Sequence, residues 1–136
     1  MTAMRYPLDT NICIYIAKRR PPRVAEHFEA VRPGELGMSI ITYGELLFGL
    51  EKSRHLGSSH ERLRRFAELI PVLPLPKDAP RHYARIRSSL EKAGTSIGAN
   101  DLWIASHGLA SDLILVSNNL REFNRVAGLK TENWAH

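Results

Sequence analysis

The chain alternates short apolar segments with longer stretches of helical periodicity, and this alternation limits the folds open to it. The clearest strand-like run is LILV at residues 113–116, which follows a helical stretch. Strands that are separated by helices usually form a parallel sheet with helices on both faces. We therefore predict an α/β fold with a central, mainly parallel, twisted sheet between two layers of helices.

The spacing of apolar residues predicts where these elements lie. Ser39 and Asp78 are expected to cap the helices that follow them. Helices are expected at residues 11–17, 24–31, 40–50, 63–70, 79–94 and 98–110. Strands are expected at residues 4–8, 36–38, 72–75 and 113–116, of which 72–75 is flanked by prolines and suits a sheet edge.

The size and charge of the chain set broad limits on its function. Its 136 residues fit one compact domain spanning 1–136. Lysine and arginine outnumber aspartate and glutamate by 19 to 14, which permits a polyanionic partner such as a nucleic acid. Many basic proteins bind no nucleic acid, so the charge alone does not decide between these classes.

Cysteine content and hydropathy indicate the compartment. Cys13 is the one cysteine, so an intrachain disulfide and a cysteine-rich zinc site are both excluded. The amino terminus reaches Asp9 before any apolar stretch that could act as a signal sequence. No run approaches the roughly 18 to 20 apolar residues that span a bilayer. We expect a cytoplasmic protein with no membrane contact.

Polar residues follow two of the predicted strands, where functional groups of parallel sheets gather. Asp9 comes directly after the first strand, and Asn119 lies three residues beyond the strand that ends at Val116. Asp101 falls in the first turn of a predicted helix, and Glu45 lies within the helix that follows Ser39. Asp9 and Asn119 are therefore candidates for one site, which the other two acids would join if the fold brings them close.

A purely structural role is the alternative for each acid taken singly. A carboxylate in a first helical turn stabilises the helix by roughly 0.3 to 1 kcal/mol, and Asp9 could simply cap the helix that begins near Asn11. Apolar residues nevertheless flank Glu45 and Asp101 on both sides, which favours partial burial. Buried carboxylates need compensating partners, so the acids taken together point beyond helix capping.

Convergence of the three acids would require a cation. Two carboxylates about 4 Å apart repel by roughly 4 kcal/mol at an effective dielectric constant near 20. A divalent ion removes this penalty, and oxygen ligands select Mg²⁺ or Mn²⁺ rather than zinc. Such an ion can activate water and stabilise the charge that develops on a phosphodiester. The sequence alone does not establish that the acids meet.

Four motifs in order resemble those of PIN-domain ribonucleases. They are LDTN at residues 8–11, YGEL at 43–46, IGANDLWIA at 97–105 and LVSNNLREFNRV at 115–126. The last motif, together with GL at 128–129 and ENW at 132–134, is similar to VapC, the toxin family of bacterial type II toxin–antitoxin pairs. The resemblance covers essentially the whole chain and implies a PIN-like three-layer sandwich.

The resemblance also implies roles for individual residues. Asp9, Glu45 and Asp101 match the three core acids of the family, which hold Mg²⁺, or Mn²⁺ as a substitute, and position the attacking water. Asn119 falls where many PIN domains carry a fourth acid and is counted with the catalytic residues. Its neutral amide can coordinate a metal through its oxygen or orient water, but it cannot act as a general base. Supporting or substrate-binding roles are expected for Asn11, Ser117, Arg19 and Arg20.

Membership of this family implies a toxin that cleaves RNA. The expected reaction is hydrolysis of single-stranded or looped RNA, with a tRNA anticodon stem-loop as a possible substrate, which blocks translation in the bacterial cytoplasm. The expected partners are a second copy of the chain and a VapB-like antitoxin, joined in a larger hetero-oligomer. Two alternatives stay open: a non-catalytic nucleic-acid-binding module such as a repressor, and a PIN-like pseudo-enzyme suggested by Asn119.

Overall fold

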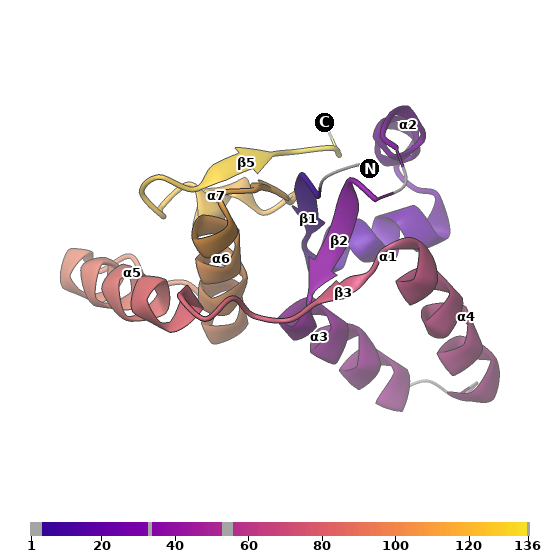
Figure 1. Ribbon diagram of the computed structural model, residues 1–136, viewed down its shortest axis with the longest axis horizontal. Helices are drawn as coiled ribbons and strands as arrows, with labels where there is room; N and C mark the ends of the chain where they lie inside the picture. The colour runs from indigo at the N-terminus through magenta and orange to yellow at the C-terminus, as the bar shows by residue number, and fades with distance from the viewer. Residues whose placement is uncertain (1–3, 33, 53–55, 136) are drawn as a thin grey trace.

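The computed structural model describes residues 4–32, 34–52 and 56–135, which form five strands and seven helices (Figure 1). The strands are β1 (Tyr6–Leu8), β2 (Leu36–Ser39), β3 (Val72–Leu73), β4 (Ile114–Val116) and β5 (Lys130–Glu132). The helices are α1 (Thr10–Lys18), α2 (Pro22–Ala30), α3 (Ile40–Glu51), α4 (Leu56–Leu69), α5 (Ala79–Ala93), α6 (Ala99–Ser111) and α7 (Leu120–Phe123).

The five strands form one parallel sheet in the order β3-β2-β1-β4-β5. From β1 the chain builds outward through β2 to β3, and it then returns to the opposite side of β1 to form β4 and β5. The connections that leave β1 and β4 therefore run in opposite directions along the sheet. Leu8 of β1 pairs with Val116 of β4 at this junction. Sheets of this kind carry their functional groups outside the carboxyl ends of the strands at such a reversal.

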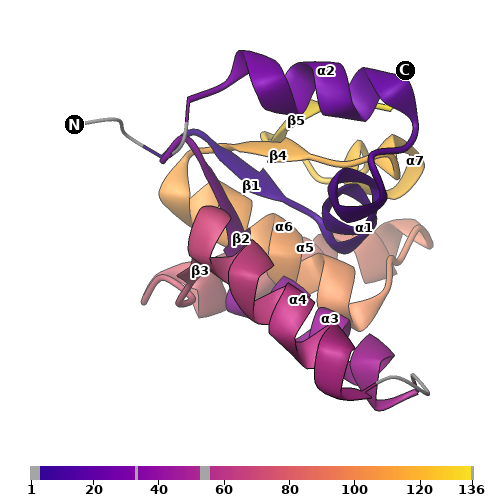
Figure 2. The same ribbon diagram turned by 90° about the vertical axis from the view of Figure 1, so that its right-hand side faces the viewer.

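Two hydrophobic clusters cover the two faces of the sheet. Val116 packs with side chains of α1 and α2, whereas its neighbour Leu115 packs with side chains of α5 and α6. This opposition follows from the alternation of side chains along a strand. Figure 2 shows α2 on one side of β1 and β4 and α6 on the other. The predicted three-layer α/β arrangement is confirmed.

Every predicted helix and strand has a counterpart in the structure, but α4 begins at Leu56, seven residues before the predicted start, one cap is wrong and two elements are not predicted. The Ser39 hydroxyl caps α3 as expected, accepting a hydrogen bond from Ile41 N at 3.2 Å. Asp78 does not cap α5: its own backbone is already helical, and its carboxylate contacts His82 Nε2 at 3.1 Å instead. The apolar pattern of the sequence does not predict α7 and β5, because elements of four and three residues are too short to show a period.

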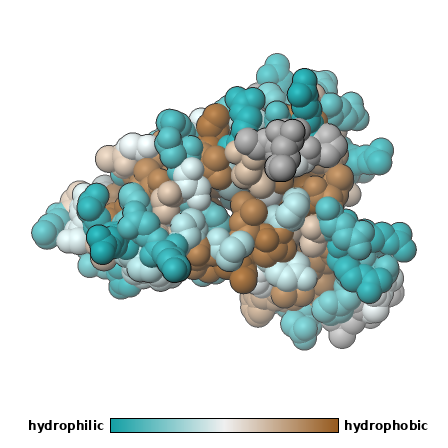
Figure 3. All heavy atoms as spheres, viewed as in Figure 1, coloured by the Kyte–Doolittle hydropathy of each residue, from teal (hydrophilic) through white to brown (hydrophobic). Residues whose placement is uncertain are grey.

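The surface combines hydrophilic helices with a few exposed apolar side chains. Figure 3 shows hydrophilic residues over the outer parts of α5 and α4, with hydrophobic residues gathered between them. Ile40 is 47% exposed, Phe48 62% and Leu69 48%, so α3 and α4 carry large apolar side chains that are about half exposed or more. In the part of the chain that the structure describes, no helix is long and apolar enough to cross a membrane.

Candidate active site

Asp9 lies at the junction of β1 and α1 and is 5% exposed. Its backbone N–H donates to the Val116 carbonyl at 3.0 Å, which extends the pairing of β1 with β4 by one residue. Its Oδ1 accepts a hydrogen bond from Ile12 N at 3.1 Å and so caps α1. The capping role weighed as an alternative is therefore real, and it leaves the second carboxylate oxygen available for other contacts.

Ser117 joins Asp9 to the loop that follows β4. Its hydroxyl donates to Asp9 Oδ2 at 2.5 Å and accepts a hydrogen bond from Asn119 N at 2.8 Å. Ser117 is fully buried, and its position follows from the pairing of Leu8 with Val116 one residue earlier. The hydroxyl thus bonds both the Asp9 carboxylate and the backbone of Asn119, and its supporting role in the reaction stays a prediction.

Glu45 approaches the same point from the middle of α3, which begins at the carboxyl end of β2. Thr10 Oγ1 donates a hydrogen bond to Glu45 Oε1 at 2.5 Å. Repulsion between Glu45 and Asp9 contributes to the raised pKa of Asp9, which places the two carboxylates within electrostatic reach. The fold therefore brings Glu45 to the edge of the sheet where β1 and β4 end.

Asp101 sits in the first turn of α6 and is half-buried. Burial, more than any other cause, raises the pKa of Asp101 to about 7. A hydrogen bond with Glu122 and repulsion from Glu122, Glu45 and Asp9 raise it further. These causes act in the same direction, so Asp101 keeps its proton to a higher pH than a free aspartate does.

Glu122 on α7 is a site residue that the sequence analysis missed. Its Oε2 accepts a hydrogen bond from Asn119 Nδ2 at 3.1 Å, and its carboxyl group faces Asp101. Asn119 therefore does not stand in the ring as a fourth acid but helps to hold one. Glu122 belongs to the motif at residues 115–126, and its place three residues after Asn119 was the available signal.

Glu122, Glu45 and Asp9 all repel Asp101 in the folded protein. Burial raises the pKa of Asp9, repulsion from Glu45 adds to this, and hydrogen bonds from Ser117 and from backbone N–H groups oppose it. In the described residues, no three His, Cys, Asp or Glu side chains already surround one point as metal ligands do. The four side chains nevertheless fit a hard divalent cation, because they all offer carboxylate oxygens and a cation would relieve the repulsion between them.

Three residues expected to support the site lie away from the acids. The side chain of Asn11 is exposed, and only its backbone N–H contacts Asp9. Arg19 and Arg20 are exposed beyond the carboxyl end of α1, about 15 Å along the helix axis from Asp9. The structure thus gathers Asp9, Glu45 and Asp101 with Ser117 and Asn119 but leaves these three side chains outside the cluster.

Comparison with known proteins identifies the family. The PIN domain model matches residues 6–129. Ribonuclease VapC2 of Haemophilus influenzae is 42% identical over 131 residues, covering 96% of this chain and 98% of that protein. The tRNA(fMet)-specific endonuclease VapC of Shigella flexneri is 39% identical over 132 residues, covering 97% and 99% respectively. The chain therefore belongs to the PIN-domain family and, within it, to the VapC ribonucleases.

A solved structure supports the same assignment at the level of the fold. VapBC-1 from nontypeable Haemophilus influenzae matches with a TM-score of 0.90 at 38% identity, covering 98% of this chain and 100% of that chain. The resemblance inferred from the four motifs is confirmed. The sheet, the helices on both faces and the order of the motifs agree with the expected PIN-like architecture.

Proposed function

We propose that this chain is a divalent-cation-dependent endoribonuclease and the toxin of a type II toxin–antitoxin pair. The observation that carries the proposal is the gathering of Asp9, Glu45, Asp101 and Glu122 around the carboxyl ends of β1 and β4. A module that only binds nucleic acid gains nothing from such a cluster, because carboxylates repel phosphates. The names of the relatives, a ribonuclease and a tRNA(fMet)-specific endonuclease, support RNA as the substrate.

The cofactor we infer is Mg²⁺, with Mn²⁺ as a substitute. Asp9, Glu45 and Asp101 would hold the ion, and Glu122 adds a fourth carboxylate beside Asp101. Carboxylate oxygens are the ligands that these hard ions prefer. When bound, such an ion lowers the pKa of water and stabilises the charge on the transferred phosphoryl group.

The remaining side chains of the site orient these acids. Ser117 keeps the Asp9 carboxylate turned toward the loop after β4, and Asn119 holds Glu122 through its amide. Because an amide does not take up a proton at neutral pH, Asn119 is a positioning residue in this scheme.

The net charge of +5 favours a polyanionic substrate through release of counterions. We infer that Arg19 and Arg20 contact phosphates several nucleotides from the cleaved bond, because they lie about 15 Å from Asp9. A structured RNA such as a tRNA anticodon stem-loop would present phosphates at both places. We place this activity in the bacterial cytoplasm, in one PIN domain that spans residues 1–136.

The partner we infer is a VapB-type antitoxin, supported by the toxin–antitoxin complex among the structural relatives. An apolar groove of about 570 Å³ runs between α1, α3 and α4. Its floor includes Ile14, Leu46, Leu63 and Phe66. We assign this groove to an apolar helix face of the antitoxin, because water-exposed apolar floors of this kind favour a covering partner.

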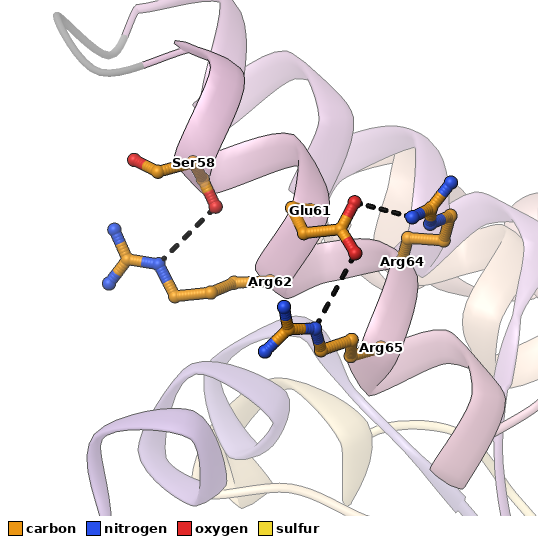
Figure 4. Close-up of polar contacts among 5 residues, drawn as sticks. All are labelled: Ser58, Glu61, Arg62, Arg64 and Arg65. Atoms are coloured by element: carbon orange, nitrogen blue, oxygen red, sulfur yellow. Dashed lines mark hydrogen bonds and ion pairs between the residues drawn. The ribbon is translucent and has the colours of Figure 1, made fainter.

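The basic residues that line the groove favour a partner with acidic residues. Lys18, Arg62 and Arg65 line the groove, and Figure 4 shows how contacts within α4 hold the two arginines. Arg62 Nε donates to the Ser58 carbonyl at 3.5 Å, and Arg65 Nε lies 3.5 Å from Glu61 Oε1. The exposed cations are therefore only weakly neutralised, so we infer an antitoxin segment that carries acidic residues beside its apolar face.

RNA cleavage by the purified chain tests the proposed function. With Mg²⁺ or Mn²⁺ we expect products that carry 5′-phosphates, and with EDTA we expect none. Asp9→Asn should lower the rate by at least about 100-fold, whereas Asp112→Asn, an exposed aspartate beyond the far end of α6, should leave it unchanged.

Two outcomes would overturn parts of this proposal. RNA binding without cation-dependent cleavage would favour the non-catalytic module or the pseudo-enzyme. Cleavage that survives Asp9→Asn would remove the assignment of the site, provided that the matched Asp112→Asn protein is equally pure and folded.

A further inference from the structure

We propose that Thr10 is a positioning residue that holds Glu45 in the acidic site, a role that rests on the proposed function. Thr10 Oγ1 donates to Glu45 Oε1 at 2.5 Å, across 35 residues of sequence. Thr10 is the first residue of α1 and directly follows Asp9, whereas Glu45 lies halfway along α3. One dipeptide at the end of β1 thus supplies one acid of the site and orients another.

Glu45 needs such a restraint because the neighbouring acids repel its carboxylate. Its carboxylate is repelled by Asp9 and by Asp101, the acids that it must approach. A glutamate side chain also loses considerable rotamer freedom when it is fixed. Within the described ranges, Thr10 is the one hydrogen-bond donor that contacts the Glu45 carboxylate. Without this hydroxyl, no hydrogen bond would oppose the repulsion.

Thr10 can act as a restraint because its own position is rigid. The residue before it is anchored twice, by Asp9 N to the Val116 carbonyl at 3.0 Å and by Asp9 Oδ1 to Ile12 N at 3.1 Å. A β-branched side chain on a helix has few accessible rotamers. The hydroxyl is therefore presented to Glu45 from a backbone that these hydrogen bonds fix at the carboxyl end of β1.

The contact also makes the two oxygens of the Glu45 carboxylate different from each other. Oε1 accepts the Thr10 hydroxyl, and in the described structure Oε2 receives no hydrogen bond. Thr10 can therefore fix the direction of Glu45 without competing for the oxygen that faces no donor. Loss of the hydroxyl is expected to weaken cation binding and to lower kcat, with little effect on KM for RNA, because Thr10 does not lie among the basic residues.

Replacement of the hydroxyl, with direct cation binding as the readout, tests this role. Thr10→Val keeps the shape and removes the donor, and Thr10→Ser restores it. We expect Thr10→Val to weaken Mn²⁺ binding, measured by calorimetry, by about 10-fold or more, as is typical when a residue that orients a metal ligand is lost. Thr10→Ser should bind nearly as the unmodified chain does. Thr131→Val, which removes a hydroxyl hydrogen bond on β5, is the matched control.

A double-mutant cycle separates positioning of Glu45 from a general structural role. In a Glu45→Ala background, Thr10→Val should cause little further loss of Mn²⁺ affinity or kcat, because the side chain that Thr10 orients is then absent. Losses that multiply would overturn the proposal. Equal impairment of Thr10→Val and Thr10→Ser would also overturn it, as would wild-type Mn²⁺ affinity in Thr10→Val. Thr10→Ala replaces the valine variant if thermal unfolding shows that valine disturbs the fold.

Failure of this inference and failure of the proposed function give different results. A chain that binds Mn²⁺ but cleaves no RNA would overturn the nuclease assignment, while the Thr10 variants would still be judged by affinity. A chain that cleaves RNA normally with Thr10→Val would overturn the role of Thr10 alone. A chain that binds no Mn²⁺ at all would overturn both.

Discussion

At the scale of single residues, the site consists of carboxylates that lie close enough to repel one another. Asp9 uses both oxygens to accept hydrogen bonds, from Ile12 N and from the Ser117 hydroxyl. Burial, a hydrogen bond with Glu122 and repulsion from the neighbouring acids raise the pKa of Asp101 to about 7. A cation that binds Asp101 below this pH must therefore displace its proton.

Binding of a cation should release a proton below pH 7. Asp101 has an ordinary pKa of 3.8, so between about pH 4 and 7 the folded chain holds a proton that the unfolded chain has lost. The contribution of this group to stability therefore falls as pH rises through that window. Because a bound Mn²⁺ requires the carboxylate, calorimetry at pH 6 in buffers of different ionisation enthalpy should detect about one released proton. Asp101→Asn should abolish the release, and an unchanged release would contradict this account.

His107 on α6 should give the opposite dependence of stability on pH. It is 2% exposed, its Nδ1 has no hydrogen-bond partner among the residues that the structure describes, and burial lowers its pKa below 6.5. The unfolded chain takes up a proton that the folded chain resists, so stability is lost as pH falls below about 6.5. His107→Leu should reduce the drop in Tm between pH 7 and pH 5. His60→Leu, at an exposed position on α4, should leave that drop intact.

The residue scale also marks the limit of sequence reasoning. Asp9, Glu45 and Asp101 were singled out because strand ends, apolar flanks and motifs all point to them. Glu122 was missed because its one-turn helix has no periodicity that could place it. Thr10 was missed because a hydroxyl that bonds a carboxylate 35 residues away becomes visible only once α1 and α3 are packed.

At the scale of elements, α4 is an amphipathic helix with an apolar face and a charged face. Leu63 and Phe66 face the groove, while Arg64 is exposed and pairs with Glu61 at 2.5 Å (Figure 4). The periodicity of residues 63–70 predicted this helix and its arginine-rich face. The sequence could not show that α1 and α3 leave a groove beside it, since that depends on the spacing of three helices.

Charge reversal on α4 should distinguish the rim of the groove from the outer face. Arg65→Glu places an acid at the groove and should weaken binding of a VapB-type antitoxin by about 10-fold or more. Arg64→Glu reverses a charge one residue away, outside the groove lining, and should change affinity little. Affinities measured by biolayer interferometry at two salt concentrations provide the comparison. Equal effects of the two changes would argue against the groove as the docking surface.

At the scale of the whole molecule, the reversal of the chain between β1 and β4 creates the site. The reversal brings residues 9 and 117 into contact, and the helices after β2 and β3 deliver Glu45 and Asp101. Alternation of strands and helices was enough to predict a parallel sheet with two helical layers. It did not predict the strand order, because which strand pairs with β1 is a long-range choice.

The exposed apolar side chains of α3 bear on the homodimer that family membership leads us to expect. Phe48 is 62% exposed, and the Lys52 ammonium lies over its ring, at 4.3 Å. If a second copy covers this face, Phe48→Glu should shift the chain from dimer to monomer in sedimentation velocity experiments. Lys77→Glu, between β3 and α5, serves as the charge control. A dimer that persists in Phe48→Glu would exclude this face as the interface.

The central claim is that four carboxylates at the β1–β4 junction hold one divalent cation. Anomalous X-ray scattering from crystals of the full chain grown with Mn²⁺ tests it most directly, because the method locates the ion itself. The account predicts an anomalous peak within coordination distance of the Asp9 and Asp101 carboxylates, at about 2.0 to 2.3 Å, and its loss in Asp101→Asn. Manganese bound elsewhere, or an unchanged peak in Asp101→Asn, would contradict the account.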